Sequence, residues 1–144
     1  MCMPEQTNTR STAVPGVHYR NAPEAIEWLC QVFGFEKHAV YPGPDNTIMH
    51  AELTLGGGMI MLGTANDNGA NRYMKVPADL GGSQTCSVSL IVKNPDEIYA
   101  RAKAAGAEIV GEIEDKAYGG RGFACLDQEG HIWYVGTYDP WAPK

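Results

Sequence analysis

Two segments carry hydrophobic residues at helical spacing, and both are built on one design. In residues 20–36, RNAPEAIEWLCQVFGFE, and residues 93–108, KNPDEIYARAKAAGAE, an Asn and a Pro open the segment and a Gly closes it. These are the preferred residues for a helix N-cap, a first helical position and a helix stop. The apolar stripes at i, i+3, i+4 and i+7 are Ile26, Leu29, Cys30 and Phe33 in the first, and Ile98, Ala102 and Ala105 in the second. The pattern predicts two helices, each with one apolar face.

Short segments typical of strands surround each helix, with one before it and three after it. They are residues 12–20, 36–42, 46–57 and 59–64 in the first half, and 85–93, 108–115, 121–128 and 131–137 in the second. The pairs Gly63-Thr64 and Gly136-Thr137 close the two halves at the same place. The sequence therefore predicts an α+β fold of two tandem βαβββ modules, with mixed sheets that curl around a cleft.

The predicted domain covers residues 14–138. Module one spans 14–64, a polar, Gly-rich linker spans 65–84, and module two spans 85–138. Residues 1–13 are polar and predict a flexible N-terminal segment, and 139–144 form a C-terminal tail.

Alternation along the strands assigns their faces. In TIMHAELTL, one face, expected to pack under the helix, carries Met49, Ala51, Leu53 and Leu55. The opposite face carries Ile48, His50, Glu52 and Thr54, and it either lines the cleft or is solvated. In the last strand, Tyr134 shares a face with Ile132 and Gly136, whereas Trp133 and Val135 share the other.

Two polar segments are predicted to be turns. LDQEG, residues 126–130, joins two strands, so Asp127, Glu129 and His131 are interpreted as a surface turn and not as a catalytic cluster. YGGRGF, residues 118–123, lacks the spacing of a phosphate-binding loop and predicts a tight hairpin. Arg121 would then stand near the cleft mouth, either meeting a polar or anionic substituent or lying solvated.

Composition narrows the function classes. The 144 residues carry a net charge of −6 without a Lys/Arg run, which argues against binding nucleic acid or an anionic membrane. The sequence shows no signal peptide and no apolar run of transmembrane length. The four cysteines are scattered without a C-x-x-C pair, which favours reduced thiols and a cytoplasmic location.

Three segments together resemble a known family: NAPEAIEWLCQVFGF, MHAELTLGGGMIMLG and YGGRGFACLDQEGHIW. In this order they are similar to the vicinal oxygen chelate superfamily, also called the glyoxalase/bleomycin-resistance/extradiol-dioxygenase fold. The resemblance runs from about Val14 to Tyr138 and departs at Gln128, where the family usually has Pro. It implies paired βαβββ modules, frequent homodimers, and a cleft that holds a divalent metal in the enzymatic members.

The family's metal ligands come from the first and last strand of each module. Carried onto this chain, these positions are Val14, Ser87, Met61 and Tyr134. None is a usual metal ligand, so the resemblance implies that the usual metal site is absent. A displaced site formed by His18, His50 and Glu52 is the alternative, of a kind that iron or zinc accepts.

Three hypotheses follow. The first is a metal-free protein, without a cofactor, that binds an apolar or aromatic small molecule and forms a homodimer. Its predicted ligand-binding residues are Ile48, His50, Glu52, Met61, Tyr118, Arg121 and Tyr134. The second is a metal-dependent lyase, isomerase or dioxygenase that uses a divalent metal at the displaced site. The third is a non-catalytic accessory domain that binds a protein partner, for which the C-terminal YDPWAP would be the exposed apolar edge. Alternatively, Tyr138 and Trp141 of this segment pack across a homodimer interface.

Overall fold

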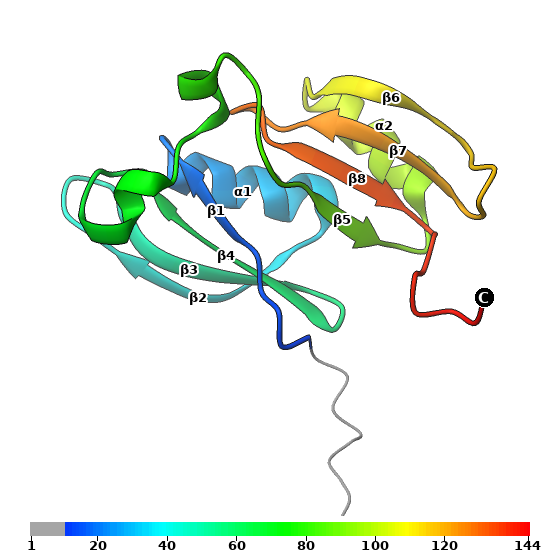
Figure 1. The fold of residues 1–144 in the computed structure, drawn as a ribbon, viewed down its shortest axis with the longest axis horizontal. Coiled ribbons are helices and arrows are strands. Elements are labelled where there is room, and N and C mark those ends of the chain that lie inside the picture. Colours follow the sequence, from blue (N-terminus) through cyan, green and yellow to red (C-terminus); the bar gives the residue numbers. More distant parts are fainter. Residues whose placement is uncertain (1–10) are drawn as a thin grey trace, which may run out of the picture. The chain divides into compact units, whose positions relative to one another are not determined.

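Each half of the chain folds as a β-α-β-β-β unit (Figure 1). The computed structural model describes residues 11–144, so Cys2 and most of the predicted flexible segment lie outside the described residues. Contacts divide the chain into two units, Met1–Met74 and Lys75–Lys144. The first unit contains β1 (Gly16–Tyr19), α1 (Ala22–Phe33), β2 (Glu36–Pro42), β3 (Ile48–Leu55) and β4 (Gly58–Thr64). The second contains β5 (Val88–Ile91), α2 (Pro95–Ala104), β6 (Glu108–Asp115), β7 (Arg121–Leu126) and β8 (Ile132–Gly136).

The two sheets have the same topology. The strand order is β1-β4-β3-β2 in the first unit and β5-β8-β7-β6 in the second. In each, the first strand pairs parallel to the last, and the remaining neighbours are antiparallel. The predicted α+β class, with two tandem modules and mixed sheets, is therefore confirmed.

The predicted cap signals act fully in α1, whereas Asn94 at the start of α2 makes no side-chain capping hydrogen bond to the backbone. The Asn21 side chain accepts a hydrogen bond from the Glu24 backbone N–H, and Gly34 ends α1 in the left-handed conformation at φ 89°. Ile26, Leu29 and Phe33 are buried on the sheet, which confirms most of the predicted stripe. Within residues 11–144, no helix has both the length and the apolar character needed to cross a bilayer.

The predicted face of β3 is correct from Ala51 onward and wrong at Met49. Ala51 and Leu53 are buried, but Met49 is 73% exposed. The reason is a bulge: β2 advances from Tyr41 to Pro42 while the pairing on β3 passes from His50 to Ile48. The extra residue interrupts the alternation, which no periodicity reading of β3 alone reveals.

In each unit, the threonine of the Gly-Thr pair forms a hydrogen bond between the last strand and the third strand, β4 to β3 in the first unit and β8 to β7 in the second. Thr64 Oγ1 accepts a hydrogen bond of 2.8 Å from the Ile48 N–H, and Thr137 Oγ1 accepts one of 2.9 Å from the Arg121 N–H. Ile48 and Arg121 are the first residues of β3 and β7. The Gly-Thr pair that repeats in the sequence therefore makes the same interstrand hydrogen bond in both units.

The linker contains two short 3-10 helices, Gly69–Tyr73 and Pro77–Leu80. Its end is fixed to the second unit because Gln84 Nε2 donates to the Gly130 carbonyl and Gln84 Oε1 accepts from the Ile132 N–H. Pro77 is buried and lies beside Gly130. Because the linker has no sequence period, its composition gave no sign of this docking.

Candidate functional site

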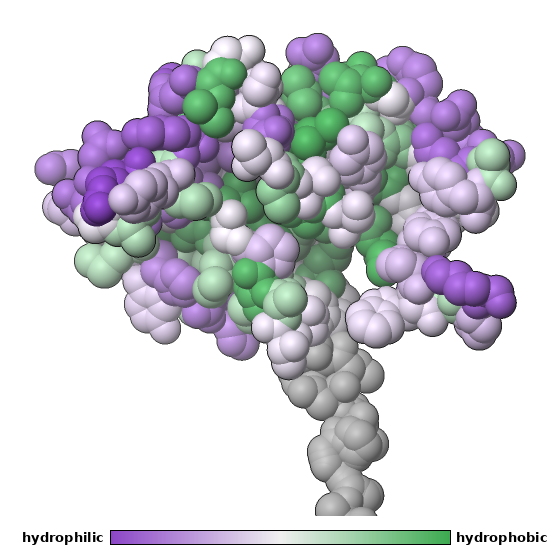
Figure 2. Space-filling view, viewed as in Figure 1, coloured by the Kyte–Doolittle hydropathy of each residue, from purple (hydrophilic) through white to green (hydrophobic). Residues whose placement is uncertain are grey.

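The open face of the second unit's sheet carries a pocket of about 610 Å³. α2 packs against β6 and β7 on the opposite face. Large apolar side chains that stay exposed line the pocket, namely Ile91, Val110, Tyr118, Tyr134 and Tyr138. In Figure 2, green and pale residues cover this sheet, and strongly hydrophilic purple residues border it. Such a concentration of exposed apolar surface is typical of a binding site.

Tyr134 stands in the middle of this face. Alternation in β8 buries Trp133 and Val135 and leaves Tyr134 46% exposed. Its neighbours across the ladder are Ser89 on β5 and Ala124 on β7. Because both neighbours are small, one side of the Tyr134 ring stays accessible. This agrees with the prediction that Tyr134 and the buried Trp133 lie on opposite faces of the last strand.

The hairpin between β6 and β7 forms one wall together with the C-terminal tail. The rings of Tyr118 and Tyr138 meet edge to face, with centroids 5.1 Å apart. Gly120 has φ 79°, and a Cβ there would lie 2.8 Å from the Tyr138 backbone nitrogen. Only a glycine permits this approach, so YGGRGF is the hairpin predicted and also holds the tail. Trp141 is exposed, and its predicted role in a homodimer stays a prediction.

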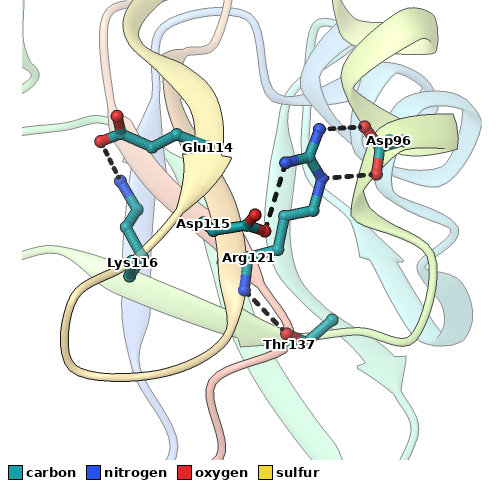
Figure 3. A network of polar contacts seen from close by, with 6 residues as sticks. All are labelled: Asp96, Glu114, Asp115, Lys116, Arg121 and Thr137. Atoms are coloured by element: carbon teal, nitrogen blue, oxygen red, sulfur yellow. Dashed lines mark hydrogen bonds and ion pairs between the residues drawn. The ribbon is translucent and has the colours of Figure 1, made fainter.

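Arg121 is bound to carboxylates on the helix side (Figure 3). Its guanidinium bonds both oxygens of Asp96, each at 2.9 Å, and Asp115 at 3.3 Å. The bonds to Asp96 raise the pKa of Arg121, and the same contact lowers the pKa of Asp96. The structure thus gives Arg121 a contact that ties β7 to α2, and its role toward a ligand stays a prediction.

The turn at Asp127 differs from the expected surface turn. Gly130 has φ 90° and closes it as predicted, but Asp127 is only 5% exposed. Its carboxylate accepts hydrogen bonds from the N–H groups of Glu129 and His131 and from Trp133 Nε1, at 2.9, 3.1 and 2.9 Å. Asp127 therefore organises the turn and satisfies a buried indole, which explains why an acid stands here.

Cys125 is buried on the helix-facing side of β7, opposite Trp133. Burial raises the pKa of the Cys125 thiol to about 12, with the nearby Asp127 charge as the smaller cause. The thiol packs in the core with no exposed surface, in an environment that disfavours the thiolate.

The open face of the first unit brings a second polar group together. His50 Nε2 lies 2.9 Å from Glu52 Oε2, and His38 Nε2 lies 4.0 Å from Glu52 Oε1. The Tyr41 ring stacks on His50, with centroids 6.0 Å apart. Met61 lies opposite Glu52 on β4, so His50, Glu52 and Met61 share this face as predicted. Ile48, by contrast, is buried, which leaves it little surface for a ligand.

The donor set does not fit the family's usual metal site. The carried-over first-strand positions, Val14 and Ser87, lie before β1 and β5 begin. On the open faces, the first-strand residues that pair with Met61 and Tyr134 are Gly16 and Ser89. None offers imidazole, carboxylate or thiolate. Of the alternative site, the structure bonds His50 to Glu52, while His18 lies on β1 opposite Gly63. Among residues 11–144, no cluster of three His, Cys, Asp or Glu is arranged to hold a metal ion.

Several pocket residues were missed from the sequence. Ser89, Val110, Lys116 and Tyr138 line the pocket beside Tyr118 and Tyr134. Strand alternation in TCSVSLIVK separates Ser89 and Ile91 from the buried Leu90, and this signal was available. The tail residue Tyr138 carries no such signal, because its position depends on the hairpin that it contacts.

The fold and the two sheets define a known class. The chain belongs to the Glyoxalase/Bleomycin resistance protein/Dioxygenase superfamily, whose family model matches residues 15–135.

Among solved structures, the chain is similar to TioX from Micromonospora sp. ML1, at 35% identity and a TM-score of 0.67, covering 88% of this chain and 97% of TioX. It is also similar to the uncharacterized protein Rv0887c of Mycobacterium tuberculosis, at 30% identity over 129 residues, which is 90% of this chain and 75% of that protein. The fosfomycin resistance protein FosX of Listeria monocytogenes shares the fold, with 13% identity, a TM-score of 0.67, and coverage of 90% and 94%.

Proposed function

We propose that this protein binds an apolar or aromatic small molecule in the pocket on the open face of the β5-β8-β7-β6 sheet. The observation that carries this proposal is the set of exposed apolar side chains gathered around one hollow of about 610 Å³. A volume of this size suits a ligand of drug-like dimensions. Three lining tyrosines each offer a flat apolar ring and a hydroxyl, which favours a planar aromatic ligand.

Binding, without metal chemistry, is the activity that this chain's own residues support. A FosX structure contains Mn(II), and that protein shares 14% identity with this chain. Here the facing positions of first and last strands carry Ser89 and Tyr134, which extend the pocket wall and offer no metal ligand of the usual kind. A ligand held by these side chains needs no reaction for the protein to act, since sequestration is itself a function.

Replacing Tyr134 with alanine is expected to weaken the binding of a neutral aromatic probe, N-phenyl-1-naphthylamine, by about tenfold. The ring of Tyr134 supplies a large part of the contact area, and the loss of one aromatic contact is worth about 1–1.5 kcal/mol. Fluorescence titration of the full chain measures the change.

The matched control is Tyr73→Ala, because Tyr73 is also exposed but does not line the pocket. Its affinity for the probe should equal that of the unsubstituted chain. If the Tyr134→Ala and Tyr73→Ala chains bind the probe equally well, this site loses its support. The same holds if the probe shows no saturable binding to the unsubstituted chain or to either variant.

A second candidate is a metal-dependent lyase, isomerase or dioxygenase, and the bond between His50 and Glu52 favours it. A carboxylate holds an imidazole in one orientation and can serve acid–base chemistry or part of a metal site. Elemental analysis of protein purified without a histidine tag separates the candidates. We expect no stoichiometric metal. One metal per chain that is lost in His50→Ala and retained in His131→Ala would establish the second candidate instead.

A further inference from the structure

The charges of the pocket have the opposite sign to the charge of the chain. The chain carries a net charge of −6. Among the described residues that line the pocket, the charged side chains are Lys116 and Arg121, and none is Asp or Glu. The charged residues that line this pocket are therefore basic, although the protein as a whole is acidic.

The two cations are not equally available. Arg121 is held by Asp96 and Asp115, and Figure 3 shows its guanidinium extending to Asp96 on α2. Lys116 instead extends toward Glu114, a single partner whose carboxylate lies 3.2 Å away and is 66% exposed. Because the Glu114 side chain is largely exposed, its carboxylate can turn into solvent at little cost, and an anionic ligand can compete for the Lys116 ammonium.

Lys116 is held at the pocket by the hairpin. Its N–H donates to the Gly120 carbonyl at 2.8 Å, and its own carbonyl accepts from the Gly119 N–H at 3.0 Å. Its side chain is only 25% exposed, so the ammonium has limited freedom and is partly shielded from water. A partly shielded cation attracts an anion more strongly than a fully solvated one.

The neutral polar groups of the pocket have donors to offer as well. The hydroxyls of Tyr118, Tyr134 and Tyr138 and that of Ser89 belong to residues lining the same hollow. Each hydroxyl can donate one hydrogen bond to an oxyanion. The pocket thus combines a flat apolar surface with several hydrogen-bond donors and the ammonium of Lys116.

We propose that the ligand class is a planar aromatic molecule that carries a carboxylate or similar oxyanion, with its ring against Tyr134 and its anion at Lys116. This inference rests on the proposed function and narrows it. It predicts a charge preference opposite to the one that the acidic surface would suggest.

A matched series of probes tests the preference: 2-naphthoate, 2-naphthamide and (2-naphthyl)methylammonium, each displacing N-phenyl-1-naphthylamine from the full chain. We expect 2-naphthoate to bind about tenfold more tightly than the amide, since a charge-assisted contact with one ammonium is worth about one factor of ten. The ammonium compound should bind most weakly.

Substitutions then assign the preference to its residue. Lys116→Met should reduce the affinity for 2-naphthoate to that for 2-naphthamide, while Lys116→Arg retains the preference. Glu114→Gln should strengthen 2-naphthoate binding about threefold because it removes the competing carboxylate. Lys93→Met makes the same charge change at an exposed lysine that does not line the pocket, and it should leave the series unchanged.

The outcomes separate this inference from the proposed function. If the ammonium compound binds as well as 2-naphthoate, or Lys116→Met leaves the 2-naphthoate preference intact, the charge assignment is wrong while the pocket stands. If none of the three compounds displaces the neutral probe, or the probe binds the Tyr134→Ala chain unchanged, the binding site itself is wrong. Thermal unfolding of each variant verifies that it is folded.

Discussion

Replacing Asp127 with alanine is expected to lower the free energy of unfolding by about 3 kcal/mol and the melting temperature by about 10 °C. The substitution removes three charge-assisted hydrogen bonds, to the N–H groups of Glu129 and His131 and to Trp133 Nε1. Trp133 is completely buried, so its indole N–H loses this acceptor in a place that water does not reach. An unsatisfied buried donor costs about 1–3 kcal/mol by itself.

Urea unfolding followed by circular dichroism measures this loss. The control is Gln128→Ala in the same turn, where the side chain is exposed, and its effect should stay within about 0.5 kcal/mol. Asp127→Asn keeps one acceptor oxygen and should fall between the two. If Asp127→Ala is no more destabilising than Gln128→Ala, the carboxylate does not organise the turn.

Replacing Gly136 with alanine is expected to cost about 2–3 kcal/mol of stability, although its backbone has no left-handed conformation. The reason is close approach. Gly136 pairs with Gly122 across β7 and β8, and a Cβ at position 136 would lie 2.7 Å from the Arg121 carbonyl oxygen and 3.0 Å from the Gly122 Cα. Both contacts are with backbone, so relief requires the strands to separate. Thermal and urea unfolding measure the cost.

A graded series of glycines tests the explanation. Gly63, the counterpart of Gly136 in the first unit, would place a Cβ 3.1 Å from the Met49 carbonyl oxygen, so Gly63→Ala should cost less than Gly136→Ala. A Cβ at Gly16 would have no neighbour within 4 Å, and Gly16→Ala should be neutral or stabilise by about 0.5 kcal/mol. Equal effects at the three positions would show that lost flexibility, and not contact distance, governs these sites.

The predictable part of the candidate site is the part fixed by strand alternation. Tyr134 is exposed between the buried Trp133 and Val135 because β8 is regular, and His50 and Glu52 share a face because β3 is regular from His50 onward. The prediction of strand faces failed where the regular alternation of the strands ended. The bulge at Met49 exposed a residue expected under the helix, and no local pattern placed Tyr138 or Lys116 beside the pocket.

The role of Asp127 was also beyond the sequence. A polar residue in a Gly-containing turn is ordinarily solvated, and the turn itself was correctly expected. The Asp127 carboxylate instead accepts from the indole of Trp133, six residues further along, and the linker docks on the same turn through Gln84 and Pro77 at Gly130. These contacts form only when the turn places Trp133 beside Asp127 and the linker docks at Gly130. The spacing of residues in the sequence does not predict either contact.

By itself, the sequence determined the β-α-β-β-β order of each half, the helix ends and the repeated Gly-Thr closure, because caps, periodicity and turns are local properties of the chain. Only the tertiary structure decided that Arg121 serves α2 through Asp96, that Asp127 is buried, and that Tyr118, Tyr134 and Tyr138 surround one pocket. Those arrangements arise from strand register and hairpin contacts between residues distant in sequence. Their physical cause is the packing of whole strands and turns against one another.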